Sequence, residues 1–162
     1  SSAEAGTLVD YFAAAAGAAF PYESDVRART ARLEDVGEER LARLEAAMRI
    51  LTDAKTYCAK CHLIGDYTPG GELATTLAPR LDRVGDRLRP EYVRRWLADP
   101  KSVLPYTAMP VNFPPTGEPM GQDLFPGTSI EQLDAVVDLL LHYDWYLSQR
   151  TSVREMVAEP DD

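Results

Sequence analysis

The chain has 162 residues, of which 45% are hydrophobic and 27% are charged, so its length suits one domain with an extension and its apolar content suffices for a core. Its formal net charge of -9 argues against a nucleic-acid-binding protein, which would carry a basic surface. The sequence also lacks the run of roughly 20 apolar residues that a transmembrane helix needs.

Helical signals fill the N-terminal third of the chain. The stretch "LVDYFAAAAGAAF" at 8–20 predicts a small, Ala-rich helix, and "FPYES" at 20–24 predicts a break after it. A stripe of apolar residues at helical spacing follows, formed by Leu33, Val36, Leu41, Leu44, Met48 and Leu51. We expect this stripe to face the core. Because it runs directly into Cys58, we expect the thiols at the end of this helix or in the turn that follows it.

Loops and helices are predicted to alternate beyond the cysteines. Residues 63–80 are rich in Gly and Pro and are expected to form a loop. The stretch "RPEYVRRWLADP" predicts a helix that begins at Pro90 and stops before Pro100. The shared face of this helix consists of Val93, Trp96 and Leu97. The proline-rich stretch from 105 to 126 excludes long stretches of regular structure.

The last helix is predicted to begin at "TSIEQL", where Thr128 and Glu131 have the spacing of a capping box. Its apolar positions continue through Leu133, Val136, Val137, Leu140, Leu141 and Leu147. After about Arg150 the chain turns acidic and is expected to fray. Since no alternating strand pattern is present, the predicted fold class is mostly α with long connections.

The stretch "CAKCH" at 58–62 contains both cysteines of the chain and one of its two histidines. Two thiols at this spacing can add to the two vinyl groups of one haem, and the adjacent imidazole then reaches the iron from the same side. The motif therefore predicts haem attached through Cys58 and Cys61, with His62 as an iron ligand.

Other uses of the motif fit the sequence less well. A thioredoxin-like dithiol would need a βαβ setting, and strands are not predicted. A structural zinc ion would need four ligands, but the second histidine, His142, lies 80 residues after His62. A disulfide or two free thiols are the remaining alternatives, although neither explains His62.

With this motif the chain resembles the mono-haem, class I c-type cytochromes of bacterial type. In that family a methionine, usually followed by proline, supplies the sixth iron ligand from a downstream loop. The stretch "YTAMP" supplies Met109 in this position, 47 residues after His62. Met120, in "GEPMG", is the main rival but lacks the following proline, and His142 is a weaker alternative. Met48 is expected in the core and Met156 in the acidic tail.

The resemblance implies further residues around the haem. Family members hydrogen-bond the ligating histidine to a proline carbonyl, and in "LAPRL" that position is Pro79, for which a rigid turn is the alternative role. The stretch "RLRPEYVRRWLADP" followed by "MP" is similar to the segment before the methionine loop in many bacterial members. Trp96 or Tyr106 is expected to donate to a haem propionate, although core packing is an equally good role for Trp96.

The resemblance also implies a domain organisation. Residues 41–150 would form the cytochrome c fold, with several helices and long loops around one haem c, and residues 151–162 an acidic tail. Residues 1–40 form an N-terminal helical extension, either a partner-docking element or part of a longer polypeptide. Ile50 and Ala54 stand where the family often has a small residue and an aromatic one, so we expect the crossing of the first and last helices to be repacked.

If protein ligands fill both axial positions, the iron has no open site for a substrate. The expected function is one-electron transfer in a respiratory-type chain, and the chain itself is not expected to be an enzyme; a peroxidase or ligand sensor would need an open site. The alternative is a fixed haem c subunit or domain of a larger membrane-associated oxidoreductase complex.

Expected partners are redox proteins, such as a membrane-bound oxidoreductase or terminal oxidase. The resemblance implies a periplasmic or otherwise exported protein, associated with a membrane only through a partner or a removed anchor.

Charge is distributed unevenly along the chain. Residues 117–162 contain ten acidic residues and only two arginines, whereas residues 102–116, around Met109, carry no charge. In the family the methionine loop borders the exposed haem edge, so an uncharged surface there would suit brief docking without desolvated ion pairs. We expect the acidic segment to steer a basic partner at long range.

Overall fold

The computed structural model describes residues 6–8, 10–11, 37–53, 58–70, 78–116, 118–148 and 152–157. The chain divides into two compact units, Ser1–Asp35 and Val36–Asp162. In the first unit, residues 6–8 and 10–11 are helical; the rest of the helix expected at 8–20, and the break after it, lie outside the described residues. The division after Asp35 lies close to the boundary expected at residue 40.

Helices form the regular structure of the second unit. They are α3 (Glu38–Thr52), α4 (Cys58–Cys61), α5 (Val84–Arg87), α6 (Pro90–Ala98), α7 (Pro100–Val103), α8 (Ser129–Leu141) and α9 (Tyr143–Ser148), followed by the 3₁₀ turn η2 (Arg154–Met156). Within the described ranges, β structure is limited to two isolated bridges, His62 with Ala78 and Ile64 with Tyr67. The predicted fold class, mostly α, is therefore confirmed.

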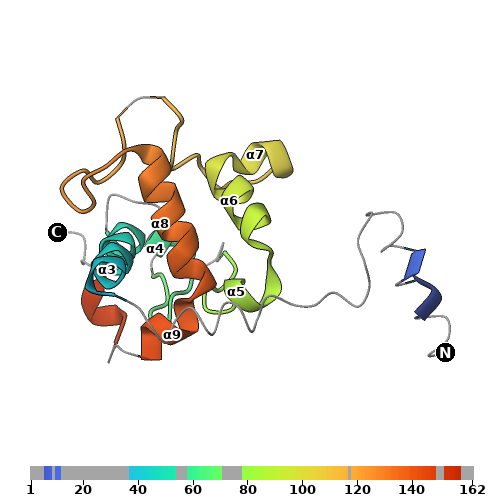
Figure 1. Cartoon of the computed structure of the whole chain (residues 1–162), viewed down its shortest axis with the longest axis horizontal. Coiled ribbons are helices and arrows are strands. Elements are labelled where there is room, and N and C mark those ends of the chain that lie inside the picture. Colours follow the sequence, from blue (N-terminus) through green and yellow to red (C-terminus); the bar gives the residue numbers. More distant parts are fainter. Residues whose placement is uncertain are drawn as a thin grey trace. The chain divides into compact units, whose positions relative to one another are not determined.

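Helix α8 lies at the centre of this unit. It contacts α3 on one side and α6 on the other, and α5 also packs against it (Figure 1). The apolar stripe of α3 is buried at Leu44, Met48 and Leu51, as predicted, whereas Leu41 is 36% exposed. Leu33 and Val36 lie outside the described residues. Because each buried aliphatic side chain contributes roughly 1.5–3 kcal/mol, the α3–α8 contact is a main source of stability.

The capping box at the start of α8 is confirmed. The Glu131 N–H donates to Thr128 Oγ1 at 3.2 Å, and the Thr128 N–H donates to Glu131 Oε2 at 2.7 Å. This pair satisfies N–H groups that the start of a helix leaves without intrahelical partners.

The predicted last helix is interrupted at His142. Helix α8 ends at Leu141, and α9 covers the part of the prediction that contains Leu147. The His142 side-chain Nδ1 lies 2.8 Å from the Asp138 carbonyl oxygen, and the His142 N–H bonds to the Leu139 carbonyl instead, at 3.0 Å. Because the imidazole occupies the carbonyl that the backbone N–H would use, the α-helical pattern stops here.

Two features differ from the prediction, and one boundary agrees with it. The thiols lie on α4, a helix separate from α3, which ends at Thr52. The helix predicted to begin at Pro90 and stop before Pro100 is confirmed as α6, and Pro100 itself begins the short helix α7, where Asp99 accepts the Ser102 N–H at 3.2 Å. Residues 152–157 do not fray, because Val153 is buried and hydrogen bonds hold the segment to Asp66.

None of the helices in the described ranges combines the length and the apolar character that crossing a membrane requires, in line with the absence of a predicted transmembrane helix.

Candidate functional site

The two cysteines lie at either end of the single helical turn α4. Residues three apart on a helix lie on the same side, so Cys58 and Cys61 face a common region. Ala59, between them, is buried and anchors the turn, while Lys60 is exposed. Neither cysteine forms a disulfide, and both residues are half-buried. Two reduced, accessible sulfurs on one side of a turn are what attachment to a single flat group requires.

His62 continues this turn, and its side chain has a fixed orientation. Its backbone N–H bonds to the Cys58 carbonyl at 2.8 Å, and its Nδ1 lies 2.7 Å from the Pro79 carbonyl oxygen. Because a carbonyl only accepts, Nδ1 carries the proton, and the Nε2 lone pair is left for another partner. Burial lowers the pKa of His62, and the hydrogen bond to Pro79 opposes this effect only in part. The side chain is therefore a neutral imidazole, the form that binds metals.

Backbone contacts hold the Pro79 carbonyl in reach of His62. The Ala78 N–H donates to the Cys61 carbonyl at 2.8 Å, and the Leu81 N–H donates to the Leu63 carbonyl at 3.1 Å. The segment after the motif and the segment around Pro79 therefore run side by side. The sequence predicted Pro79 as the acceptor for His62, and the geometry agrees with that prediction.

Met109 lies in the loop after α7, next to Trp96 of α6. The Trp96 Nε1–H donates to Met109 Sδ at 2.9 Å, and the Met109 N–H donates to Thr107 Oγ1 at 3.2 Å. The Trp96 ring stacks on Tyr92, with ring centroids 6.1 Å apart. Met109 packs against the edge of the core. Its thioether is thus held by one donor, and a thioether sulfur has a second lone pair available.

The remaining predicted residues occupy different surroundings. Tyr106 is 84% exposed, and no residue in the described ranges hydrogen-bonds to it. Met120 lies half-buried in a turn of the proline-rich loop, Met48 is in the core as predicted, and Met156 packs against the core edge from η2. Of the predicted site residues, the structure therefore pairs His62 with Pro79 and Trp96 with Met109, while Tyr106 faces solvent.

A separate charged cluster connects α3 to α8. Arg40 donates to both carboxylate oxygens of Asp138, at 2.7 and 3.1 Å, and His142 Nδ1 lies 3.1 Å from the same carboxylate. Burial alone would raise the pKa of Asp138, but the hydrogen bonds from His142 and Arg40, together with the positive charge of Arg40, lower it to about 2. His142 is buried at the junction of α8 and α9, and this contact explains its position without a metal-binding role.

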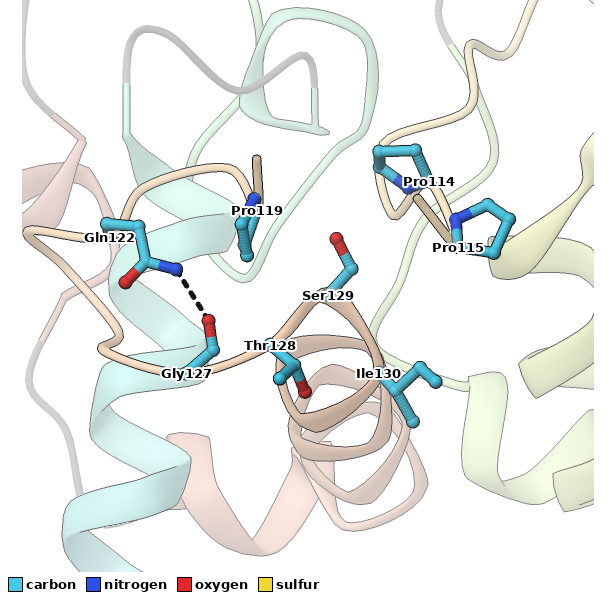
Figure 2. Close-up of a pocket in the computed structure, with 8 residues that line it drawn as sticks. All are labelled: Pro114, Pro115, Pro119, Gln122, Gly127, Thr128, Ser129 and Ile130. Carbon is cyan, nitrogen blue, oxygen red and sulfur yellow. Dashed lines mark hydrogen bonds between the residues drawn. The ribbon is translucent and has the colours of Figure 1, made fainter. Parts of the chain in front are cut away.

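A hollow of about 470 Å³ lies at the N-terminus of α8 and contains none of the predicted site residues. It is lined by Pro114, Pro115, Pro119, Gln122, Gly127, Thr128, Ser129 and Ile130. Figure 2 shows Ser129 between the prolines, and its hydroxyl has no hydrogen-bond partner among the described residues. That hydroxyl is fully buried.

The sequence did not reveal two features of this region. The contact between Trp96 and Met109 joins residues 13 apart across a helix and a loop, and no spacing rule indicates it. Arg80 and Asp82 bind backbone groups of Gly65 in the loop after His62, and Asp66 of the same loop accepts the Val153 N–H. Only the closeness of these residues to "CAKCH" hinted at such a role.

Comparisons of the chain with protein-family models, with curated proteins and with solved structures found no significant match.

Proposed function

We propose that the chain carries one haem c, attached through Cys58 and Cys61, with His62 and Met109 as iron ligands, and that it transfers single electrons. The observation that carries this proposal is the geometry of "CAKCH". Two cysteines that form no disulfide share one side of a helical turn, and the neutral imidazole beside them is oriented by Pro79 with Nε2 available. This combination fits haem better than a redox dithiol or a disulfide, for which His62 would have no use.

The described residues fit the covalent attachment. Each thiol would add across one vinyl group, with the sulfur forming a C–S bond and the proton going to the neighbouring carbon, so no oxidant is needed. Cys58 and Cys61 would fix the position of the group, and His62 would supply the first axial nitrogen. When bound, the haem iron supplies a reversible one-electron change between its ferric and ferrous states.

The surroundings of Met109 support it as the second axial ligand. Trp96 holds the sulfur through one lone pair, which leaves the other for iron, and the loop lies against the core edge. Met120 has no comparable donor among the described residues. Thioether ligation favours ferrous iron, so a comparatively high reduction potential is expected.

The helix arrangement supports a cytochrome c fold in particular. Helix α3 leads to the cysteines, packs on the long C-terminal helix α8, and is separated from it in sequence by the loop that carries Met109. Ile50 is fully buried in α3, whereas Ala54 lies outside the described residues, so the proposed repacking of this helix crossing stays a prediction.

The proposal predicts a simple spectroscopic result. The chain is exported in a host that attaches haem c, and absorption spectra are recorded for the oxidised, reduced and pyridine-denatured protein. We expect haem that survives denaturation and the weak near-infrared band of methionine-ligated ferric iron.

A double variant, Cys58→Ala with Cys61→Ala, serves as the control and should lose all retained haem. If the unmodified chain also retains none, haem attachment is refuted. Retained haem without the near-infrared band would refute Met109 ligation while leaving attachment intact.

A further inference from the structure

The described residues after α9 bind to the loop that follows His62. The Ser152 hydroxyl donates to Asp66 Oδ2 at 2.7 Å, and the backbone N–H groups of Val153 and Arg154 donate to Asp66 Oδ1 at 2.7 and 3.2 Å. One carboxylate thus holds three consecutive residues, and charge-assisted bonds of this kind are stronger than neutral ones. We call residues 152–157 the C-terminal clasp.

The clasp also packs against the backbone of this loop. Val153 is 2% exposed, and its Cγ2 atom lies only 2.7 Å from the position that a Cβ on Gly65 would occupy. Gly65 has a φ of +57°, a conformation that glycine adopts without strain. Because Gly65 has no side chain, it can adopt the positive φ of the turn and can also allow Val153 of the clasp to approach closely.

From Gly65 the contacts continue to the acceptor of His62. The Gly65 N–H donates to Asp82 Oδ1 at 2.9 Å, and the Arg80 guanidinium donates to the Gly65 carbonyl at 3.1 Å and to Asp82 Oδ2 at 2.8 Å. Arg80 directly follows Pro79, whose carbonyl accepts from His62 at 2.7 Å. Without the clasp, this turn would keep the Gly65–Asp82 hydrogen bond, the backbone bonds between Ile64 and Tyr67 and the half-exposed Arg80–Asp82 ion pair, and exposed pairs of this kind contribute little.

We infer that the C-terminal clasp fixes the hydrogen bond between His62 and Pro79, and that Asp66 is the positioning residue that anchors the clasp. The inference rests on the proposed haem attachment, in which His62 is an iron ligand. A fixed acceptor on Nδ1 keeps the orientation and basicity of a ligating imidazole constant. The clasp acts through the loop, since the hydrogen bonds from Ser152, Val153 and Arg154 go to Asp66 and not to His62 or Met109.

The test compares Asp66→Ala with the unmodified full-length, haem-loaded protein in the ferrous state. Solvent exchange of the His62 Nδ1 proton and of the Val153 amide proton is followed by NMR. Loss of one anchoring hydrogen bond corresponds to about a tenfold change in an opening equilibrium, so we expect both protons to exchange about tenfold faster or more. Asp66→Asn keeps one carbonyl oxygen for the Val153 N–H and should give an intermediate rate.

Asp134→Asn is the matched control, because it also removes one negative charge. Asp134 pairs with Arg94 between α8 and α6, and both side chains are about half exposed. It should leave both exchange rates unchanged. If Asp66→Ala does not fold, Asp66→Asn and Ser152→Ala provide the same comparison with smaller perturbations.

Two results would overturn the inference. The first is faster exchange at Val153 with unchanged exchange at His62, which would mean that the clasp opens without affecting the ligand. The second is unchanged exchange at Val153, which would mean that Asp66 is not the anchor.

Haem retention is measured separately by the pyridine spectrum, so failure of the proposed function can be distinguished from failure of the inference about the clasp. If the unmodified chain holds no haem, the amide protons of Gly65 and Ala78 are followed in the haem-free chain. Faster exchange in Asp66→Ala would still support anchoring of the loop, and unchanged exchange would overturn it.

Discussion

Trp96 illustrates how one contact changes the role of a residue. Its indole N–H donates to the sulfur of Met109, and the expected contact with a haem propionate stays a prediction. Hydrogen-bond donation withdraws electron density from a thioether and makes it a weaker donor to a metal. Trp96 therefore orients Met109 and, under the proposed function, adjusts the reduction potential through the axial ligand.

Replacing Met109 with Ala should open the sixth iron site. The near-infrared band should disappear, the reduction potential should fall markedly, and the ferrous protein should bind carbon monoxide, because the thioether that favours ferrous iron is lost. Spectra and redox titration measure these changes. Met120→Ala is the control and should leave all three properties unchanged; if it removes the band instead, Met120 is the ligand.

Trp96→Phe should have a smaller and different effect. The ring still packs, but the donor to Met109 Sδ is gone, so the sulfur becomes a stronger ligand for ferric iron. A difference of about 1 kcal/mol between the two redox states corresponds to a potential lowered by about 40 mV. Redox titration measures the shift, and the near-infrared band should remain. A loss of that band would mean that Trp96 holds the loop as a whole.

At the level of elements, α5 depends on its close approach to the end of α8. A Cβ on Gly85 would lie 2.4 Å from the Leu141 carbonyl oxygen, and this neighbour is backbone, which cannot rotate away. For residues 84–87, which form α5, the sequence alone yielded no prediction. The glycine thus explains how a four-residue helix fits between the loop of Asp82 and the C-terminal end of α8.

Gly85→Ala should destabilise the protein, because α5 must move away from Leu141. Overpacking of this kind costs about 1–3 kcal/mol, to be measured as the change in the free energy of unfolding by urea. Gly70→Ala, where no atom lies within 4 Å of the added Cβ, should have little effect. Equal effects of both variants would show that backbone freedom, and not the contact, determines the cost.

For the whole molecule, the Arg40–Asp138–His142 cluster makes stability depend on pH. The pKa of Asp138 is lowered from 3.8 to about 2 in the folded state. Since the folded pKa lies below the unfolded one, the contribution is complete above about pH 4 and is lost as the pH falls through about 2. A shift of this size corresponds to about 2 kcal/mol.

Asp138→Asn should therefore lose about 2 kcal/mol at neutral pH and should show a flatter decline in stability between pH 4 and 2. Urea unfolding at a series of pH values measures both effects. Asp134→Asn, which removes an exposed partner of Arg94, should cost less than 1 kcal/mol. An unchanged pH profile in Asp138→Asn would assign the acid sensitivity to other carboxylates.

The sequence by itself determined the local features of this protein. The capping box of Thr128 and Glu131, the start of α6 at Pro90, the burial of Leu44, Met48 and Leu51, and the mostly helical fold class follow from periodicity and backbone chemistry, which act over a few residues. The spacing of Cys58, Cys61 and His62 likewise defines the predicted chemistry before any fold is known.

Only the tertiary structure decided which distant residues meet. The donor to Met109, the break of the last helix at His142 and the anchoring of residues 152–157 on Asp66 each depend on a contact that local patterns do not encode. From its composition alone, an acidic C-terminal segment is predicted to fray. The described part of this segment, residues 152–157, is held in place because the Asp66 carboxylate, 87 residues before Val153, accepts the Val153 N–H, and such long-range pairing is fixed only when the chain folds.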